Sequence, residues 1–107
     1  MIRVICQPEP SNFDSTIRRP GIQFLKECNL AVGQSTPSKF EWRPLWRLAL
    51  EDLYDSYDGI CAYLGIKMEF SQGGVSVDHF EPKHSNPFRA FDWDNFRLTS
   101  TRMNSRK

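Results

Sequence analysis

Apolar side chains recur at spacings of three and four residues between positions 44 and 57, which is the period of an amphipathic helix. Pro44 suits the first turn of such a helix, and Gly59 follows its end. We expect the stripe to pack into the core, because burial is the commoner use of an aromatic stripe, although it could also bind a partner. Its members are Leu45, Trp46, Ala49, Leu50, Leu53, Tyr54 and Tyr57.

Two shorter helices are predicted before this one. Ser11 can cap the first, which we expect to end near Arg18. Pro20 then fixes φ at a value suited to the first turn of a second helix, whose apolar residues lie within 22–25. A loop over 33–38 follows.

The pattern becomes strand-like after Gly59. Residues 60–70 are apolar, 71–74 are expected to form a turn, and 75–77 alternate as a half-buried strand does, so a hairpin or two short strands fit. A second short strand is predicted over 96–98, and Ser100 or Thr101 can cap a helix running to the last residue. That helix would be barely two turns long, so it needs packing from a longer chain or from a partner.

The order of these elements predicts an α+β fold in a single domain over 1–107. We expect a helical scaffold over 1–59, followed by a strand, loop, strand and helix over 60–107. The loop over 81–94 is rich in Pro, Asn, Ser and Asp, and loops of this length inside a small domain tend to be functional.

Composition narrows the class of protein. With 39% hydrophobic and 25% charged residues, the chain is expected to fold rather than stay disordered. It contains no apolar stretch long enough to cross a bilayer and its start does not resemble a signal peptide, so we expect a cytoplasmic protein without a membrane partner. Cys6, Cys28 and Cys61 are odd in number and widely spaced, which favours buried, reduced thiols.

Charge is nearly balanced over the whole chain, at a formal +1, but not along it. From position 79 onward six lysines and arginines face three acidic residues, an excess of three positive charges. A phosphate-bearing partner is plausible at this end of the chain, although surface Arg and Lys are often only solvated.

Three segments of this second half together resemble the HNH endonuclease motif, whose fold is the ββα-metal fold. They are VDHFEP at 77–82, DWDNFRL at 92–98 and MNSRK at 103–107. Each segment alone is weak, but their order and spacing together make the resemblance specific. It covers about the C-terminal half of the chain, and implies a C-terminal ββα-metal motif packed on the N-terminal helices.

The resemblance implies a role for four residues. His79 would be the general base, a task suited to an imidazole that titrates near neutral pH. Asp78 and Asn104 would bind one divalent ion, and two oxygen donors suit Mg²⁺ or Mn²⁺. Asn95 would hold the loop in shape and help orient the base. Taken alone, each could be structural: a satisfied histidine, a turn residue or a helix-surface residue.

Candidate phosphate contacts are Lys83 in the loop and basic residues that follow it, which could equally be only solvated. We expect solvation for His84. The remaining candidates are Arg97, Arg102, Arg106 and Lys107.

The chain departs from family members that carry two C-x-x-C pairs around a structural zinc. Cys61 stands where the first pair would begin, but Leu64 replaces its partner, and Ser100 and Met103 stand where the second pair would be. No structural zinc is therefore expected, and packing must replace the metal's contribution to folding.

The expected function is a metal-dependent endonuclease acting on nucleic acid, with DNA favoured. By analogy with small HNH proteins it could serve antiphage defence, and the PEPSNFD and RRPGIQFL segments resemble HNH subunits that act beside an ATPase. The alternative is an inactive HNH-fold module that binds nucleic acid or a protein. Retention of all four motif residues favours the enzyme, and the missing zinc cysteines mildly favour the module.

Overall fold

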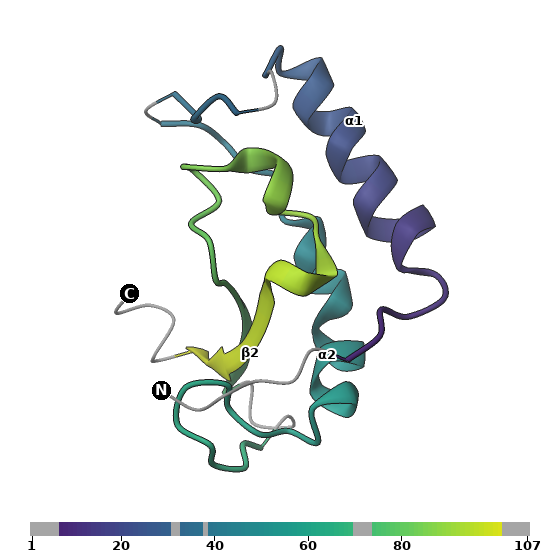
Figure 1. The fold of residues 1–107 in the computed structure, drawn as a ribbon, viewed down its shortest axis with the longest axis vertical. Coiled ribbons are helices and arrows are strands. Elements are labelled where there is room, and N and C mark those ends of the chain that lie inside the picture. Colours follow the sequence, from purple (N-terminus) through teal and green to yellow (C-terminus); the bar gives the residue numbers. More distant parts are fainter. Residues whose placement is uncertain (1–6, 31–32, 38, 70–73, 102–107) are drawn as a thin grey trace.

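Helices come first along the chain and strands second, so the fold is α+β. The computed structural model describes residues 7–30, 33–37, 39–69 and 74–101. Its main elements are two α-helices and two antiparallel strands (Figure 1). They are α1 (Arg19–Glu27), α2 (Leu50–Ser56), β1 (Val75–His79) and β2 (Phe96–Ser100).

The first two expected helices are one continuous helix, so the predicted break at Pro20 is wrong. A π-helical segment, η1 (Asp14–Arg18), runs directly into α1, and the N–H of Arg19 donates to the Asp14 carbonyl. Pro20 lacks an N–H and its ring crowds the carbonyl four residues earlier in a regular α-helix. The π turn just before Pro20 shifts the hydrogen-bond register at the point where the helix accommodates the proline. The helix also starts at Phe13, without the side-chain cap that Ser11 was expected to supply.

The predicted helix over 44–57 is present, with a tighter first half. A 3₁₀ segment, η2 (Leu45–Ala49), leads into α2, and the turn after α2 contains Gly59. Gly59 has φ of +69°, and a Cβ there would overlap the Tyr54 ring. Glycine therefore allows the chain to leave α2 and turn back toward the sheet.

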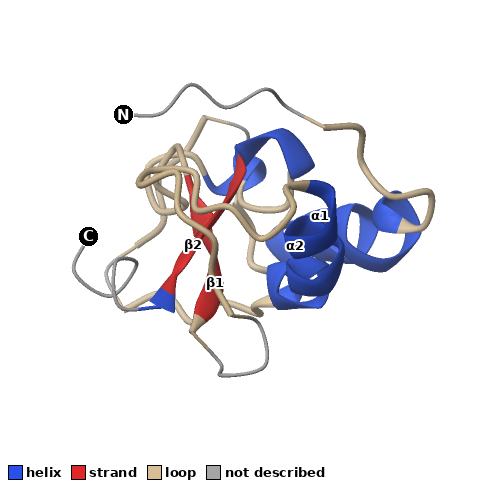
Figure 2. Ribbon diagram, turned by 90° about the horizontal axis from the view of Figure 1, so that it is seen from below, coloured by secondary structure: helices blue, strands red, loops and turns tan. Residues whose placement is uncertain are grey.

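The two strands expected in the second half pair with each other. Val77 lies opposite Leu98, and His79 lies opposite Phe96. Residues 60–70 contribute less than expected, because their described part makes only an isolated bridge between Ile60 and Lys67. Helices α1 and α2 lie to one side of the strands (Figure 2).

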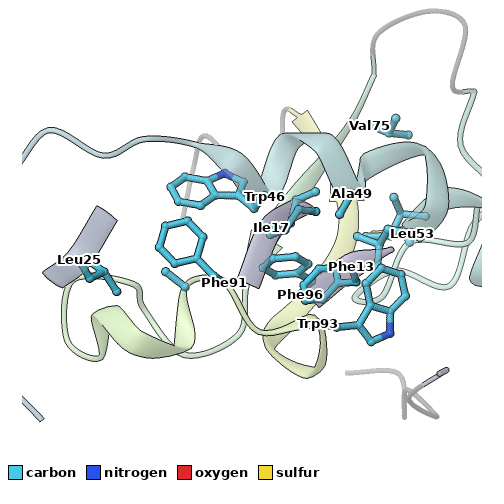
Figure 3. Close-up of a cluster of buried hydrophobic side chains, with 14 of the residues drawn as sticks. Phe13, Ile17, Leu25, Trp46, Ala49, Leu53, Val75, Phe91, Trp93 and Phe96 are labelled. Atoms are coloured by element: carbon cyan, nitrogen blue, oxygen red, sulfur yellow. The ribbon is translucent and has the colours of Figure 1, made fainter. Parts of the chain in front are cut away.

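One hydrophobic core joins the two halves of the chain. Phe13 on the first helix packs edge-to-face against Trp93 and Phe96, with both centroid separations at 5.7 Å. Trp46 on η2 lies 5.7 Å from Phe91 in the loop between the strands (Figure 3). Edge-to-face aromatic pairs stabilise a fold by more than the burial of their apolar area alone. The scaffold helices therefore support the loop and strands directly.

Helix α1 comes close to the loop between the strands at Gly21. A Cβ on this buried glycine would overlap the Phe91 ring, whose own side chain is fully buried. Gly21 has ordinary helical geometry, so the glycine is needed here for close packing rather than for an unusual φ.

Some sequence expectations concern residues outside the described ranges. Of the helix expected to end the chain, only Thr101 is described, and Cys6 also lies outside. Cys61 is buried as expected, whereas Cys28 is exposed beyond the end of α1, so that expectation is wrong. Within the described part of the chain, no helix combines the length and apolar character needed to span a bilayer.

Candidate functional site

A cleft of about 650 Å³ opens where η2 faces the end of β1. Asp78 and His79 border it from the strand, and Trp46 and Arg47 border it from η2. The loop after β1 supplies a further part of the rim, including Lys83. The cleft therefore brings a candidate base, a carboxylate and two cations together from segments far apart in the sequence.

His79 is held at one ring nitrogen by the backbone of the loop. Its Nε2 lies 3.0 Å from the Ala90 carbonyl oxygen. A carbonyl can only accept, so Nε2 carries the proton, and the lone pair of the neutral imidazole is on Nδ1. Trp46 and Phe96 pack edge-on against the ring at centroid separations of 4.7 Å and 5.6 Å. The side chain is thus fixed in orientation, and Nδ1 is its basic atom.

Asn95 closes the loop at its base. Its fully buried amide accepts a hydrogen bond from the Glu81 N–H at 2.7 Å, and donates to the Glu81 and Arg89 carbonyls at 3.2 Å and 3.0 Å. The backbone carbonyl of Asn95 also accepts a hydrogen bond from the Phe80 N–H, at 2.9 Å. We call this set of hydrogen bonds from the Asn95 side chain to Glu81 and Arg89 the clasp. Because Arg89 adjoins Ala90, the clasp also fixes the carbonyl that orients His79.

Asp78 is buried beside His79, with 4% of its surface exposed. The Tyr63 hydroxyl donates to its Oδ2. Burial, together with the hydrogen bond to Asp78 and the negative charge of that carboxylate, raises the pKa of Tyr63 above its ordinary value. Tyr63 therefore stays protonated and acts as a donor that positions the Asp78 carboxylate.

Asp78 is chemically suited to a hard divalent ion. A carboxylate can accept several hydrogen bonds or metal contacts, so the bond from Tyr63 does not exhaust it. The proposed second ligand, Asn104, lies outside the described residues. Among the residues that are described, no three histidine, cysteine, aspartate or glutamate side chains group as a metal site would require.

The candidate phosphate contacts do not all gather at the cleft. Lys83 borders it, with Nζ 5.5 Å from the centre of the Trp46 ring. Arg97 instead donates to the Asp94 and Phe96 carbonyls and lies over Phe80. The other three, Arg102, Arg106 and Lys107, lie outside the described residues.

Several cleft residues were not identified from the sequence. Trp46 was predicted to be buried, and it is, but it also borders the cleft with Trp42 and Arg47. His84 is exposed as expected, yet it stands at the rim, and its carbonyl accepts from the Thr36 N–H at 2.9 Å. No local signal marks these positions, because the cleft forms only when η2 packs against the strand.

No protein-family model, curated protein or solved structure matches this chain.

Proposed function

We propose that the protein is a metal-dependent endonuclease of the HNH type, which hydrolyses phosphodiester bonds in nucleic acid. The observation that carries the proposal is the arrangement of His79: the imidazole borders the cleft while its Nε2 is held by the Ala90 carbonyl. Asn95 braces the same loop. This is the support that a general base needs, because a base must present one nitrogen in a fixed direction.

In the proposed reaction, Nδ1 of His79 accepts a proton from a water molecule as the water oxygen attacks phosphorus. The bond from phosphorus to the leaving oxygen then breaks. A divalent ion held by Asp78 and Asn104 would stabilise the charge on the phosphate and on the leaving oxygen. Tyr63 keeps the Asp78 carboxylate in place through its hydroxyl. Lys83 at the rim adds positive charge where a phosphate would enter.

The test is a cleavage assay on single-stranded and duplex DNA and RNA with Mg²⁺, Mn²⁺ or EDTA. We expect cleavage that EDTA abolishes, and a loss of at least about 100-fold in His79→Ala, the scale typical of removing a general base. His79→Gln distinguishes the loss of the general base from a loss of folding. The glutamine amide can still donate to the Ala90 carbonyl, but it cannot take up the proton from water. It should be as inactive as His79→Ala while remaining folded.

Lys26→Gln is the matched surface control, because Lys26 is exposed on α1 away from the cleft. It should cleave as the unaltered protein does. Asp78→Ala and Asn104→Ala should weaken both cleavage and Mn²⁺ binding. Normal cleavage by His79→Gln would refute the mechanism. No cleavage with either metal would favour the alternative, an inactive module that binds nucleic acid or a protein.

A further inference from the structure

A second hollow of about 430 Å³ adjoins the cleft. It is bordered by Lys39 and Phe40, and it shares Trp42 and His84 with the cleft itself. The two hollows adjoin at Trp42 and His84, and together, from His79 past Trp42 to Phe40, they are called the groove below. Together they have a volume comparable with that of pockets for organic ligands, room for about one or two nucleotides.

Aromatic rings form a wall along this groove. Trp42 lies between Phe40, at a centroid separation of 5.0 Å, and Trp46, at 5.7 Å. Both pairs meet edge-to-face, at 77° and 68°, rather than stacked in parallel. Trp42 and Phe40 are only half-buried, so part of each ring remains accessible from the groove.

Among the described residues that line the groove, most of the charged side chains are basic. They include Lys39, Arg47 and Lys83 against the single carboxylate of Asp78. This local excess matters because the whole chain carries a formal charge of only +1. A groove with cations and accessible aromatic rings suits a polyanion whose bases are free to stack.

We propose that this groove binds unpaired nucleotides, so that the substrate is a single-stranded nucleic acid or a single-stranded region. A base would stack on Trp42, and the neighbouring phosphates would lie along Lys39, Arg47 and Lys83. Bases within a duplex already stack on one another and cannot reach a ring wall. Since every base presents a π-face, the groove predicts little sequence preference. This inference rests on the proposed function in one respect only: the nuclease reaction decides which of the bound phosphates is cut.

Binding is measured without cleavage, by fluorescence anisotropy of labelled oligonucleotides in EDTA, with the full chain. Single-stranded DNA and RNA are each compared with the matching duplex at one salt concentration. We expect both single strands to bind more tightly than their duplexes. Duplex binding as tight as single-strand binding would overturn the proposal.

Variants at Trp42 test the stacking itself. Trp42→Phe keeps an aromatic ring and Trp42→Leu keeps only apolar bulk, so both should preserve the fold, which thermal unfolding checks. Trp42→Leu should weaken single-strand binding by at least about fivefold relative to Trp42→Phe, the lower end of what one base stack is worth. Equal binding by the two variants would overturn the proposal.

A charge variant keeps the test valid if Trp42→Leu unfolds. Lys39→Gln should reduce the slope of log Kd against log salt concentration by about 0.7, as expected for one lost contact to a single-strand phosphate. Lys26→Gln, an exposed lysine outside the groove, should leave the slope unchanged. Equal slopes for the two variants would overturn the placement of the strand.

Cleavage of the same oligonucleotides separates this inference from the proposed function. Single-strand binding that depends on Trp42, without any cleavage in Mg²⁺ or Mn²⁺, would support the groove and refute the nuclease. Cleavage that needs His79 but acts on duplex at least as well, with no effect of Trp42→Leu, would refute the groove and support the nuclease.

Discussion

Asn95 shows how much one buried side chain can organise. Its amide satisfies groups on both arms of the loop between β1 and β2, and these partners, the Glu81 N–H and the Glu81 and Arg89 carbonyls, are all backbone groups. Backbone groups do not change with the sequence of the loop, so the clasp can persist while the loop's side chains vary. The tip of the loop can therefore carry substrate contacts while its base stays fixed.

Asn95→Ala should destabilise the protein by about 2–4 kcal/mol, because it leaves buried donors and acceptors without partners. Asn86→Ala is the matched control, since the Asn86 amide makes one hydrogen bond to the half-exposed Glu81 carboxylate. It should cost less than about 1 kcal/mol. Urea unfolding followed by tryptophan fluorescence measures both, and equal losses would contradict the clasp.

Tyr63→Phe should destabilise the fold by about 1–2 kcal/mol, because a buried carboxylate loses a donor. Tyr57→Phe removes a hydroxyl that accepts from the neutral Gln7 N–H, so its effect should be smaller. If the proposed metal site is correct, Tyr63→Phe should also weaken Mn²⁺ binding and Tyr57→Phe should not. Equal Mn²⁺ affinity in the two variants would remove Tyr63 from any positioning role.

Among the elements, α1 depends on a glycine that intrinsic helix propensity disfavours. Gly21→Ala would stabilise an exposed helix by up to about 1 kcal/mol. Here the added methyl group meets the Phe91 ring, which is buried in the core. We expect the opposite sign, a loss of about 1–3 kcal/mol from overpacking. Thermal unfolding of Gly21→Ala beside Gln23→Ala, at an exposed position of the same helix, decides the sign.

The strands and the second helix could be predicted because their patterns are local. The alternation at 75–77 and the threefold and fourfold spacing in 44–57 each record which face is buried. The continuous first helix could not be predicted, because Pro20 normally marks a boundary, and only the π turn before it lets the helix continue.

At the scale of the whole molecule, Arg18 connects three parts of the chain. Its guanidinium contacts Glu9 at 2.5 Å in the N-terminal segment and Asp14 at 3.1 Å on the helix. It also lies 3.6 Å from Asp92, at the end of the loop, and over the Phe13 ring. The network joins the start of the described chain to the loop that carries the candidate site.

This network predicts a pH dependence of stability. The hydrogen bond from Arg18 lowers the pKa of Glu9 below its ordinary value of 4.5. A depressed pKa gives stability that is present above the ordinary value and is lost as the pH falls through the folded value. Because the pair is partly exposed, the loss should be at most about 1 kcal/mol. Urea unfolding from neutral to acidic pH should show it, and Glu9→Gln should flatten that part of the profile.

Glu27→Gln is the control for this experiment, since Glu27 is exposed at the end of α1, outside the network. Its profile should follow that of the unaltered protein. A Glu9→Gln profile as steep as the control's would show that Arg18 does not hold Glu9 in solution.

Half of the candidate site could be predicted from the sequence, and the reason is geometric. Asp78, His79 and Asn95 lie within one short stretch of the chain, so their spacing along it could be used to predict them. The opposite wall, with Trp42 and Arg47, comes from η2 and the segment just before it, more than thirty residues earlier. Its place at the cleft depends on packing between elements, which no local pattern records.

The cleft takes one wall from each half of the chain, which limits how the protein can be cut into fragments or its site moved into another protein. Residues 60–107 contain the strands and the loop, but Trp46, whose ring packs against His79, belongs to the first half. A fragment cut at Gly59 would lack one wall of its own cleft and several partners in the shared core. Transplanting the strand-loop-strand segment into another scaffold therefore requires a host that supplies an indole at this position. If the two halves are expressed separately, they should restore the cleft only when they associate through this Trp46–His79 contact and the shared core.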